Sequence, residues 1–519
     1  MKLNYKRTIL VGFAFFLISA FWQAYDATIP VILTNKFGMS QTWSGVIMAL
    51  DNILAVFMLP LFGTLSDKCL GNKFGKRTPF ITIGTTIAAI AIVCLSFVDS
   101  AQLNNISAVA TIDDPAALSV IYDTQADTQL QTPEGDVFVL SQVFTEEEFT
   151  AIRMKITDAE DEEITNPDYT NYVVPARQAY AAQVTASNTT PLILFIILLL
   201  VVLISMATFR SPAVALMPDV TVKPLRSKAN AIINLMGTAG GILVLVLGIL
   251  FSTSAIRNAL MRYHVYYGII AAIMLGALTV FLLTVREKKW AAEMQADSVK
   301  FGIEEAVEDN SEKRGLTASE MKSLILILLS IALWYFGYNA VTSKYAVYAG
   351  NILDKDYNTT MLLAQAAAIV SYLPAGMVAS KIGRKKTILA GIIMLTTAFA
   401  AAAFMRAGSP TWLMNVFFAL AGIAWATINV NSFPMVVEMC SGADIGKYTG
   451  FYYTASMTAQ IITPMLSGFL MDQPKMGMTI LFPYAAIFVG LAFVTMSLVK
   501  HGDAKIVAKK GLEALDIDD

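Results

Sequence analysis

Cysteine, histidine and charge are all scarce in this sequence of 519 residues. The three cysteines, Cys69, Cys94 and Cys440, lie far apart, which excludes a disulfide framework and a Cys-x-x-Cys metal or redox site. Two histidines are too few for a histidine-based metal site or proton relay. Charged residues make up 15% of the chain, against about 25% in soluble domains. A soluble multidomain enzyme, a disordered chain and a basic nucleic-acid binder are therefore all excluded.

Long apolar runs take the place of the missing charge, and the mean hydropathy is +0.60. A bilayer core about 30 Å thick needs about 20 apolar helical residues. In these runs apolar and polar residues do not alternate as they do in the strands of a membrane barrel, so the runs predict helices. The first run could instead be a signal peptide, but it continues through WQAYDATIP without a small-residue cleavage site. The predicted spans are 9–33, 42–63, 79–98, 190–217, 228–252, 263–284, 322–349, 359–380, 385–405, 410–437, 446–471 and 479–499.

The basic residues predict the orientation of these spans. If the N-terminus is cytoplasmic, 26 of the 37 Lys and Arg residues fall in cytoplasmic segments and nine fall outside, with Arg210 and Lys344 inside spans. Cytoplasmic loops carry the excess of basic residues in membrane proteins. We therefore predict a multi-pass protein of the cytoplasmic membrane with both termini in the cytoplasm.

Charge also marks out an insert between the third and fourth spans. Residues 99–188 hold 16 acidic and three basic residues, a local charge of −13. VFVLSQVF (137–144) predicts a strand and TEEEFTAIRMKI (145–156) a helix, with Thr145 and Glu148 forming a capping box. A small α+β domain outside the membrane is expected, either a solvated cap or a site for cation or substrate capture. DAEDEE (158–163) lacks the glycine and ligand spacing of a calcium loop, so no metal site is predicted.

The expected organisation has six parts. They are the first three helices of an N-terminal bundle (1–98), the insert (99–188), the next three helices (189–284), a cytoplasmic linker (285–321), a C-terminal bundle of helices 7–12 (322–500) and a cytoplasmic tail (501–519).

Two similar loops indicate an internal duplication. GTLSDKCLGNKFGKRTPFI (63–81) follows the second span, and GMVASKIGRKKT (376–387) follows the second span of the other half. Aligning Gly63 with Gly376 pairs the halves at an offset of 313 residues. Transporters are commonly built from such repeats, with the substrate site between them. GNKFGKRT does not have the spacing of a nucleotide-binding P-loop, and no cofactor is predicted.

The first loop resembles the signature of the major facilitator superfamily. Its extended form, with FRSPAVALMPDV (209–220) and GIAWATINVNSFPMVVEM (422–439), is similar to the branch of sucrose, proton-associated sugar and glycoside–pentoside–hexuronide transporters. The resemblance implies an all-α fold of twelve transmembrane helices in two six-helix repeats. It also implies a sugar as the substrate, coupled to a proton or to a sodium ion. Nothing in the sequence demands a dimer, so a monomer is expected.

Charged residues inside spans are costly and need a function or a partner. Asp26 and Asp51 lie at similar depth on adjacent spans, about 12–14 Å below the outer edge at 1.5 Å per residue. They could share a proton or a cation, or else form a structural ion pair or cap a kink beside Pro30. Lys344 could pair with one of them during transport, or its ammonium could reach the outer surface. We predict Asp26, Asp51 and Lys344 as proton-coupling residues.

The predicted gate lies at the cytoplasmic face, where acidic and basic side chains could exchange partners as the halves move. A positive-inside signal alone would explain Lys76 and Arg77 but not Gly63 and Asp67. Arg210 is interpreted as a gate or a contact with lipid phosphate in preference to a substrate contact. The predicted gating residues are Gly63, Asp67, Lys68, Lys76, Arg77, Arg210 and Asp219.

Sugar sites combine hydrogen-bonding side chains with aromatic platforms in a cavity. The 313-residue offset places Asp26 opposite Asn339, so two polar clusters within spans agree with the duplication. For any single aromatic side chain, the membrane interface or bundle packing is the alternative. The predicted substrate-binding residues are Trp22, Gln23, Tyr25, Trp334, Tyr338, Asn339, Gln365, Trp425 and Asn429.

Together these patterns predict a secondary transporter that moves a sugar, such as a disaccharide or glycoside, with a proton by alternating access. One alternative is a carrier for uptake or efflux of another small solute. A second is a transporter-like sensor in which the insert binds a ligand. No nucleophile–base or metal constellation appears, so no enzyme activity is predicted.

Overall fold

A computed structural model describes residues 3–69, 71, 74–157, 163–222, 225–253, 255–300, 316–437, 439 and 445–502. Most of the DAEDEE segment, the middle of the cytoplasmic linker and most of the C-terminal tail lie outside the described residues.

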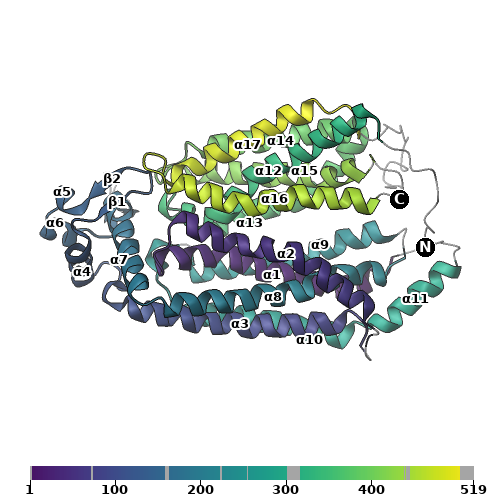
Figure 1. Cartoon of the computed structure of the whole chain (residues 1–519), viewed down its shortest axis with the longest axis horizontal. Coiled ribbons are helices and arrows are strands. Elements are labelled where there is room, and N and C mark those ends of the chain that lie inside the picture. Colours follow the sequence, from purple (N-terminus) through teal and green to yellow (C-terminus); the bar gives the residue numbers. More distant parts are fainter. Residues whose placement is uncertain are drawn as a thin grey trace.

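Twelve long helices form the bulk of the part of the chain that the structure describes (Figure 1). Ten helices in the described residues are long and apolar enough to cross a membrane, and α13 and α16 lie among them in the bundle. Each predicted span falls on one of the twelve, which confirms the all-α membrane fold. Their bounds are α1 (Tyr5–Asn35), α2 (Gln41–Lys68), α3 (Thr78–Asn105), α8 (Thr190–Asp219), α9 (Arg226–Phe251), α10 (His264–Thr284), α12 (Ala318–Asn351), α13 (Tyr357–Ile382), α14 (Arg384–Ala402), α15 (Thr411–Val437), α16 (Ile445–Met471) and α17 (Leu481–Ser497).

The helices form two halves, each with its own apolar core. Helices α1, α2, α3, α8, α9 and α10 make the N-half, and α12–α17 make the C-half. In Figure 1 the two halves lie as parallel layers, with the insert at one end and the start of α1 and the end of α17 at the other. We call these the insert end and the termini end. Helix α2 packs on α16, α9 on α13 and α1 on α12, so these pairs form the seam between the halves.

The insert is a small α+β unit with a core of its own. Two antiparallel strand pairs, β1 with β2 and β3 with β4, lie among short helices. The register pairs Leu130 with Phe138 and Ile156 with Ile164. The bounds are η1 (Ser107–Val109), α4 (Pro115–Gln125), β1 (Gln129–Gln131), β2 (Val137–Val139), α5 (Leu140–Val143), α6 (Glu146–Ala151), β3 (Lys155–Thr157), β4 (Glu163–Thr165), η2 (Tyr169–Val173) and α7 (Val174–Ser187).

The insert confirms one local prediction and corrects two. Thr145 and Glu148 form the predicted capping box, and these hydrogen bonds hold the pKa of the Glu148 carboxyl below its usual value. The strand predicted over 137–144 ends at Val139, because Leu140 turns into the insert core and begins α5. The helix predicted over 145–156 ends at Ala151, because the chain then pairs as β3 with β4.

Three shorter elements complete the described chain: η4 (Ile256–Asn258), α11 (Glu287–Lys300) and η6 (Met478–Ile480). Helix α11 lies at the termini end, after the last helix of the N-half (Figure 1). The Arg7 guanidinium lies 4.9 Å from the ring centre of Trp290 and pairs with Glu293. These contacts attach the start of the linker to the N-half.

Candidate functional site

A cavity of about 200 Å³ lies on the seam between the two halves. Five helices contribute to it, three from the N-half and two from the C-half, so any movement of the halves changes its shape. The residues that line it are Trp22, Tyr25 and Asp26 of α1, Met48, Asp51 and Asn52 of α2, Arg210 of α8, Asn339, Thr342 and Ser343 of α12, and Gln460 and Pro464 of α16.

The cavity gathers charged side chains in the middle of membrane-spanning helices. Asp26 and Asp51, predicted from separate spans, line the same space. The Asn52 side-chain amide donates a hydrogen bond of 2.7 Å to Asp51 Oδ1, which fixes the position of that carboxylate. The Arg210 guanidinium lies 5.7 Å from the ring centre of Trp22. An ionisable group at this depth is stabilised by a polar cavity and by opposite charge, and this cavity supplies both.

Three buried polar atoms that belong to cavity residues have no hydrogen-bond partner within the described part of the chain. They are Trp22 Nε1, Tyr25 Oη and Asn339 Nδ2. The Thr342 hydroxyl lies 3.4 Å from Asn339 Oδ1, so the carbonyl side of that amide is engaged and the amino side is not. Buried polar groups in proteins are nearly always satisfied, so these atoms are available to water or to a bound solute.

Two predicted substrate residues bond to each other across the seam. Gln365 Nε2 of α13 donates to Gln23 Oε1 of α1 at 2.5 Å, and Gln23 Nε2 donates to the Tyr357 hydroxyl at 3.2 Å. The three side chains thus join the halves beside the cavity. In this arrangement the two glutamine side chains are hydrogen-bonded to each other.

The predicted aromatic platform of the C-half is packed on itself. The Tyr338 and Trp425 rings stack with centroids 3.6 Å apart and planes at 7°. Asn429 lies one helical turn beyond Trp425 on α15 and is partly buried. Trp334 is buried to 1% exposure in the core of the C-half. The structure therefore brings Trp22, Tyr25 and Asn339 to the cavity and places the other predicted aromatic residues in the packing around it.

Lys344 is fully buried at the insert end of the seam. Its ammonium donates to the backbone carbonyl of Gln41, at the start of α2. The Asp472 carboxylate, at the end of α16, accepts from the backbone N–H groups of Gln41 (2.8 Å) and Thr42 (2.7 Å). An acceptor from one half therefore caps a helix of the other, and a carboxylate is favourable at that positive helix end.

Close helix packing accompanies these hydrogen bonds. A Cβ atom at Gly45 would lie 2.0 Å from the Pro464 carbonyl oxygen, and one at Gly468 would lie 2.2 Å from the Gln41 carbonyl oxygen. Only glycine permits this approach of α2 to α16. The Asn358 amide of α13 also donates to the Thr253 hydroxyl, just after α9, at 3.0 Å. The halves are thus joined on the insert side of the cavity.

The loop predicted as a gate forms an ion-pair cluster at the termini end. Arg77 pairs with Asp67 of α2 and, at 2.8 Å, with Asp219 at the end of α8. Lys76 lies 3.4 Å from Asp219, whereas Lys68 is exposed. At Gly63 a Cβ atom would lie 2.8 Å from the Ser211 hydroxyl, so this glycine lets α2 approach α8. The ion-pair partners that the structure describes for Arg77 and Lys76 belong to the N-half.

Sequence reasoning missed the residue that holds this loop. Glu287, at the start of α11, accepts hydrogen bonds from the backbone N–H groups of Lys76, Arg77 and Thr78 at 2.7–2.8 Å. It also accepts from the Thr78 hydroxyl and is 3% exposed. A carboxylate at a helix N-terminus is a familiar stabilising element, but the two segments lie some 210 residues apart and no local pattern links them.

Sequence reasoning also missed several polar residues that line the cavity. Asn52, Thr342, Ser343 and Gln460 line it, and none was predicted. Gln460 is an amide within the apolar part of α16, and polarity within a span was the available signal. Asn52, Thr342 and Ser343 adjoin predicted residues, and only their place on the helix face distinguishes them.

Comparison with known proteins identifies the fold. Residues 353–514 match the family model described as Major Facilitator Superfamily. An MFS-type transporter, ppzB, from Metarhizium rileyi is 26% identical over 144 residues, which are 28% of this chain and 29% of that protein. The matched part of the chain thus spans under a third of this curated relative.

Two solved structures share the fold over almost their whole length. The xylose transporter XylE from E. coli, in an inward open conformation, superposes with a TM-score of 0.58 at 14% identity, covering 99% of both chains. A mutant of the nucleoside transporter NupG superposes with a TM-score of 0.55 at 15% identity, covering 95% of this chain and 100% of that one. Together with the family match over residues 353–514, these likenesses show that the chain has the fold of these transporters.

Proposed function

We propose that this protein is a transporter that moves a sugar together with a proton by alternating access of the seam cavity to the two sides of the membrane. One observation carries the proposal: Asp26, Asp51 and Arg210 share a cavity with three unpartnered polar groups on Trp22, Tyr25 and Asn339. Sugar hydroxyl groups can both accept and donate hydrogen bonds, and the indole ring offers an apolar face. Both features suit a sugar.

The two carboxylates support proton coupling in this proposal. Asp51 is fixed by Asn52 and shares the cavity with the Arg210 guanidinium. A proton bound by Asp51 or Asp26 would remove one negative charge from the cavity and leave Arg210 with a weaker partner. Protonation would thus change the forces between α2 and α8 when the solute binds. In this proposal Lys344 contributes at the insert end of the seam, where its ammonium donates a hydrogen bond to the backbone of α2.

The orientation and the gate are proposed on the distribution of charge. The ion-pair cluster of Arg77, Asp67 and Asp219 lies at the termini end, where basic residues are concentrated in the sequence. Basic residues favour the cytoplasmic side, so we place both termini in the cytoplasm and the insert outside. The cluster would act as the cytoplasmic gate by exchanging partners as the halves move. We further propose the cytoplasmic membrane as the location and a monomer as the working unit.

A second candidate substrate class is a nucleoside, because one protein of the same fold transports nucleosides. A nucleoside also presents hydroxyl groups and a ring face. Competition in proteoliposomes distinguishes the two classes. Vesicles that contain the purified protein are loaded either with a labelled hexose or with a labelled nucleoside, and unlabelled hexoses, disaccharides, glycosides and nucleosides are added outside. Exchange driven by sugars alone supports the proposal, exchange driven by nucleosides alone favours the second class, and exchange with neither contradicts both.

A further inference from the structure

The insert contacts both halves of the carrier, although its chain connects only to the N-half. It leaves α3 and returns through α7 to α8, both helices of the N-half. Gln178 of α7 donates to Asn35 Oδ1 at 2.8 Å, and Gln102 of α3 donates to the Thr185 hydroxyl at 2.9 Å. The buried Lys36–Asp99 ion pair, at 2.6 Å, lies beside these bonds. The base of the insert is therefore fixed on the N-half.

The turn between β1 and β2 reaches across to the C-half. The backbone N–H of Lys475 donates to the Gly135 carbonyl, and that of Met478 donates to the Pro133 carbonyl, both at 2.7 Å. Figure 1 shows β1 and β2 on the side of the insert nearest the C-half. Both segments belong to connections, 132–136 in the insert and 472–480 between α16 and α17. Two backbone hydrogen bonds thus join the halves outside the helical bundle.

Side chains add to this contact. Gln131 Nε2 donates to the Gln473 carbonyl at 3.2 Å, and Arg406, just after α14, pairs with Glu134 at 3.3 Å. The two loops are shaped for close approach. Gly135 and Gly477 both have positive φ, and a Cβ atom at Gly135 would lie 2.7 Å from the Gly477 nitrogen. We call these residues, 131–135 with 473–478 and Arg406, the clasp.

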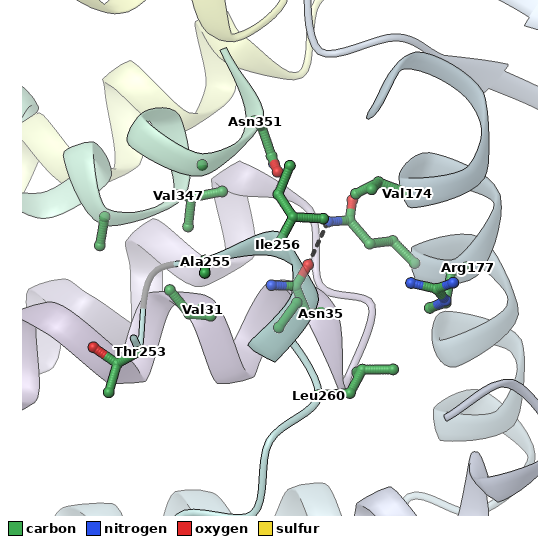
Figure 2. A pocket seen from close by; sticks show the side chains of 14 residues that line it. Val31, Asn35, Val174, Arg177, Thr253, Ala255, Ile256, Leu260, Val347 and Asn351 are labelled. Carbon is green, nitrogen blue, oxygen red and sulfur yellow. Dashed lines mark hydrogen bonds between the residues drawn. The ribbon is translucent and has the colours of Figure 1, made fainter. Parts of the chain in front are cut away.

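A small cavity marks where the insert, the N-half and the C-half meet. It has a volume of about 30 Å³, room for a water molecule but not for a solute. Figure 2 shows Val347 and Asn351 of α12, Val31 and Asn35 of α1, and α7 of the insert around it, with the Gln178–Asn35 bond at one edge. The insert therefore packs against both halves at the insert end of the seam.

We propose that the insert holds the insert side of the transport pathway shut through the clasp, and that the clasp must release before the cavity can open on that side. The proposal rests on the alternating access proposed above. If the halves separate at the insert end, a turn fixed on the N-half cannot keep its bonds to the C-half. The clasp therefore favours the state that is closed at the insert end and sets how often the other state is reached.

The first test measures access to the seam directly. Cys69, Cys94 and Cys440 are replaced by serine, and Ala346→Cys, at a position 2% exposed beside the small cavity, serves as the reporter. A membrane-impermeant maleimide is added on the insert side. Gly135→Val should break the clasp and raise the labelling rate about tenfold, since several hydrogen bonds that favour the closed state are lost together.

Two further variants keep this test decisive. Asp123→Val, at an exposed position on α4 away from the clasp, should leave the labelling rate unchanged. Glu134→Arg should raise the rate in the same direction as Gly135→Val, and adding Arg406→Glu should bring it back toward the starting value. Equal labelling of Gly135→Val and the Asp123→Val control would overturn the proposal, and so would a charge reversal without effect.

The second test locks the clasp. Glu134→Cys with Arg406→Cys is bridged by a cleavable bifunctional thiol reagent that spans the two replaced side chains. Ser119→Cys with Glu146→Cys, whose parent side chains bond at 2.7 Å within the insert, is the matched control. The clasp bridge should stop solute exchange until it is cleaved, and the control bridge should not. If exchange continues while the clasp is bridged, the proposed role of the clasp is wrong, but the proposed transport function stands. A wild-type protein without exchange refutes the proposed function, while labelling still reports on the clasp.

Discussion

At the scale of single residues, the structure brings some of the predicted side chains to the cavity and places others in the packing around it. Asp51 and Trp22 line the cavity, whereas Trp334 is buried in the core of the C-half and the Tyr338 and Trp425 rings stack on each other. Sequence patterns placed all of these on the right spans. They could not say which face of a helix each one occupies relative to the seam, because twelve nearly uniformly apolar helices carry little periodic signal.

Replacement of Asp51 tests the coupling role. Asp51→Asn keeps the size of the side chain but cannot gain and lose a proton. Uphill accumulation should fall to an inside-to-outside ratio of one, while exchange of preloaded solute continues. A pH gradient of one unit can drive about a tenfold accumulation for one proton per solute, so the loss is measurable in vesicles. Asp123→Asn, on the exposed face of the insert, is the control. Unchanged accumulation in Asp51→Asn would remove this residue from coupling.

Replacement of Trp22 tests the solute contact. Trp22→Phe keeps an aromatic face but removes the unpartnered indole N–H. One hydrogen bond contributes about 0.5–1.5 kcal/mol, so the KM for the solute should rise roughly two- to tenfold with little change in the maximal rate. Trp412→Phe, at a side chain 68% exposed on α15, should leave the KM as it is. If both variants behave like the wild type, Trp22 does not contact the solute.

At the scale of elements, the spans were predictable and the contacts between them were not. Every predicted span lies within a few residues of a helix, because runs of about 20 apolar residues have few other structures open to them. The described strands of the insert are only three residues long, too short to show alternation, so the strand predicted over 137–144 begins correctly but extends past Val139. Glu287 could not be found at all, because its partners lie on a distant loop.

The α2–α16 crossing gives a prediction at this scale. Gly468→Ala places a Cβ atom against the Gln41 carbonyl oxygen, so the helices must separate. Overpacking of this kind costs about 1–3 kcal/mol. The thermal unfolding midpoint in detergent should fall by several degrees. Gly276→Ala on α10, where a Cβ atom meets nothing within 4 Å, should be neutral or stabilising by up to about 1 kcal/mol. If the two variants unfold at the same temperature, α2 and α16 are not in close contact at Gly468.

At the scale of the whole molecule, the duplication was the most informative feature of the sequence. The offset of 313 residues between Gly63 and Gly376 pairs Asp26 with Asn339, and both residues line the seam cavity. A repeat places equivalent positions on opposite sides of a shared axis, which explains why the two residues paired by this offset line the same cavity. The insert has no counterpart in the second half, so the repeat could not predict its contact with 473–478.

The movement of protons during solute flow tests whether solute and proton cross this seam together. Wild-type protein is reconstituted in lightly buffered vesicles with no gradient, and the effective sugar from the competition assay is added outside. Symport predicts a transient rise in external pH that a protonophore abolishes and that Asp51→Asn lacks. Sugar entry at the wild-type rate with no change in external pH would show that the sugar crosses without a proton.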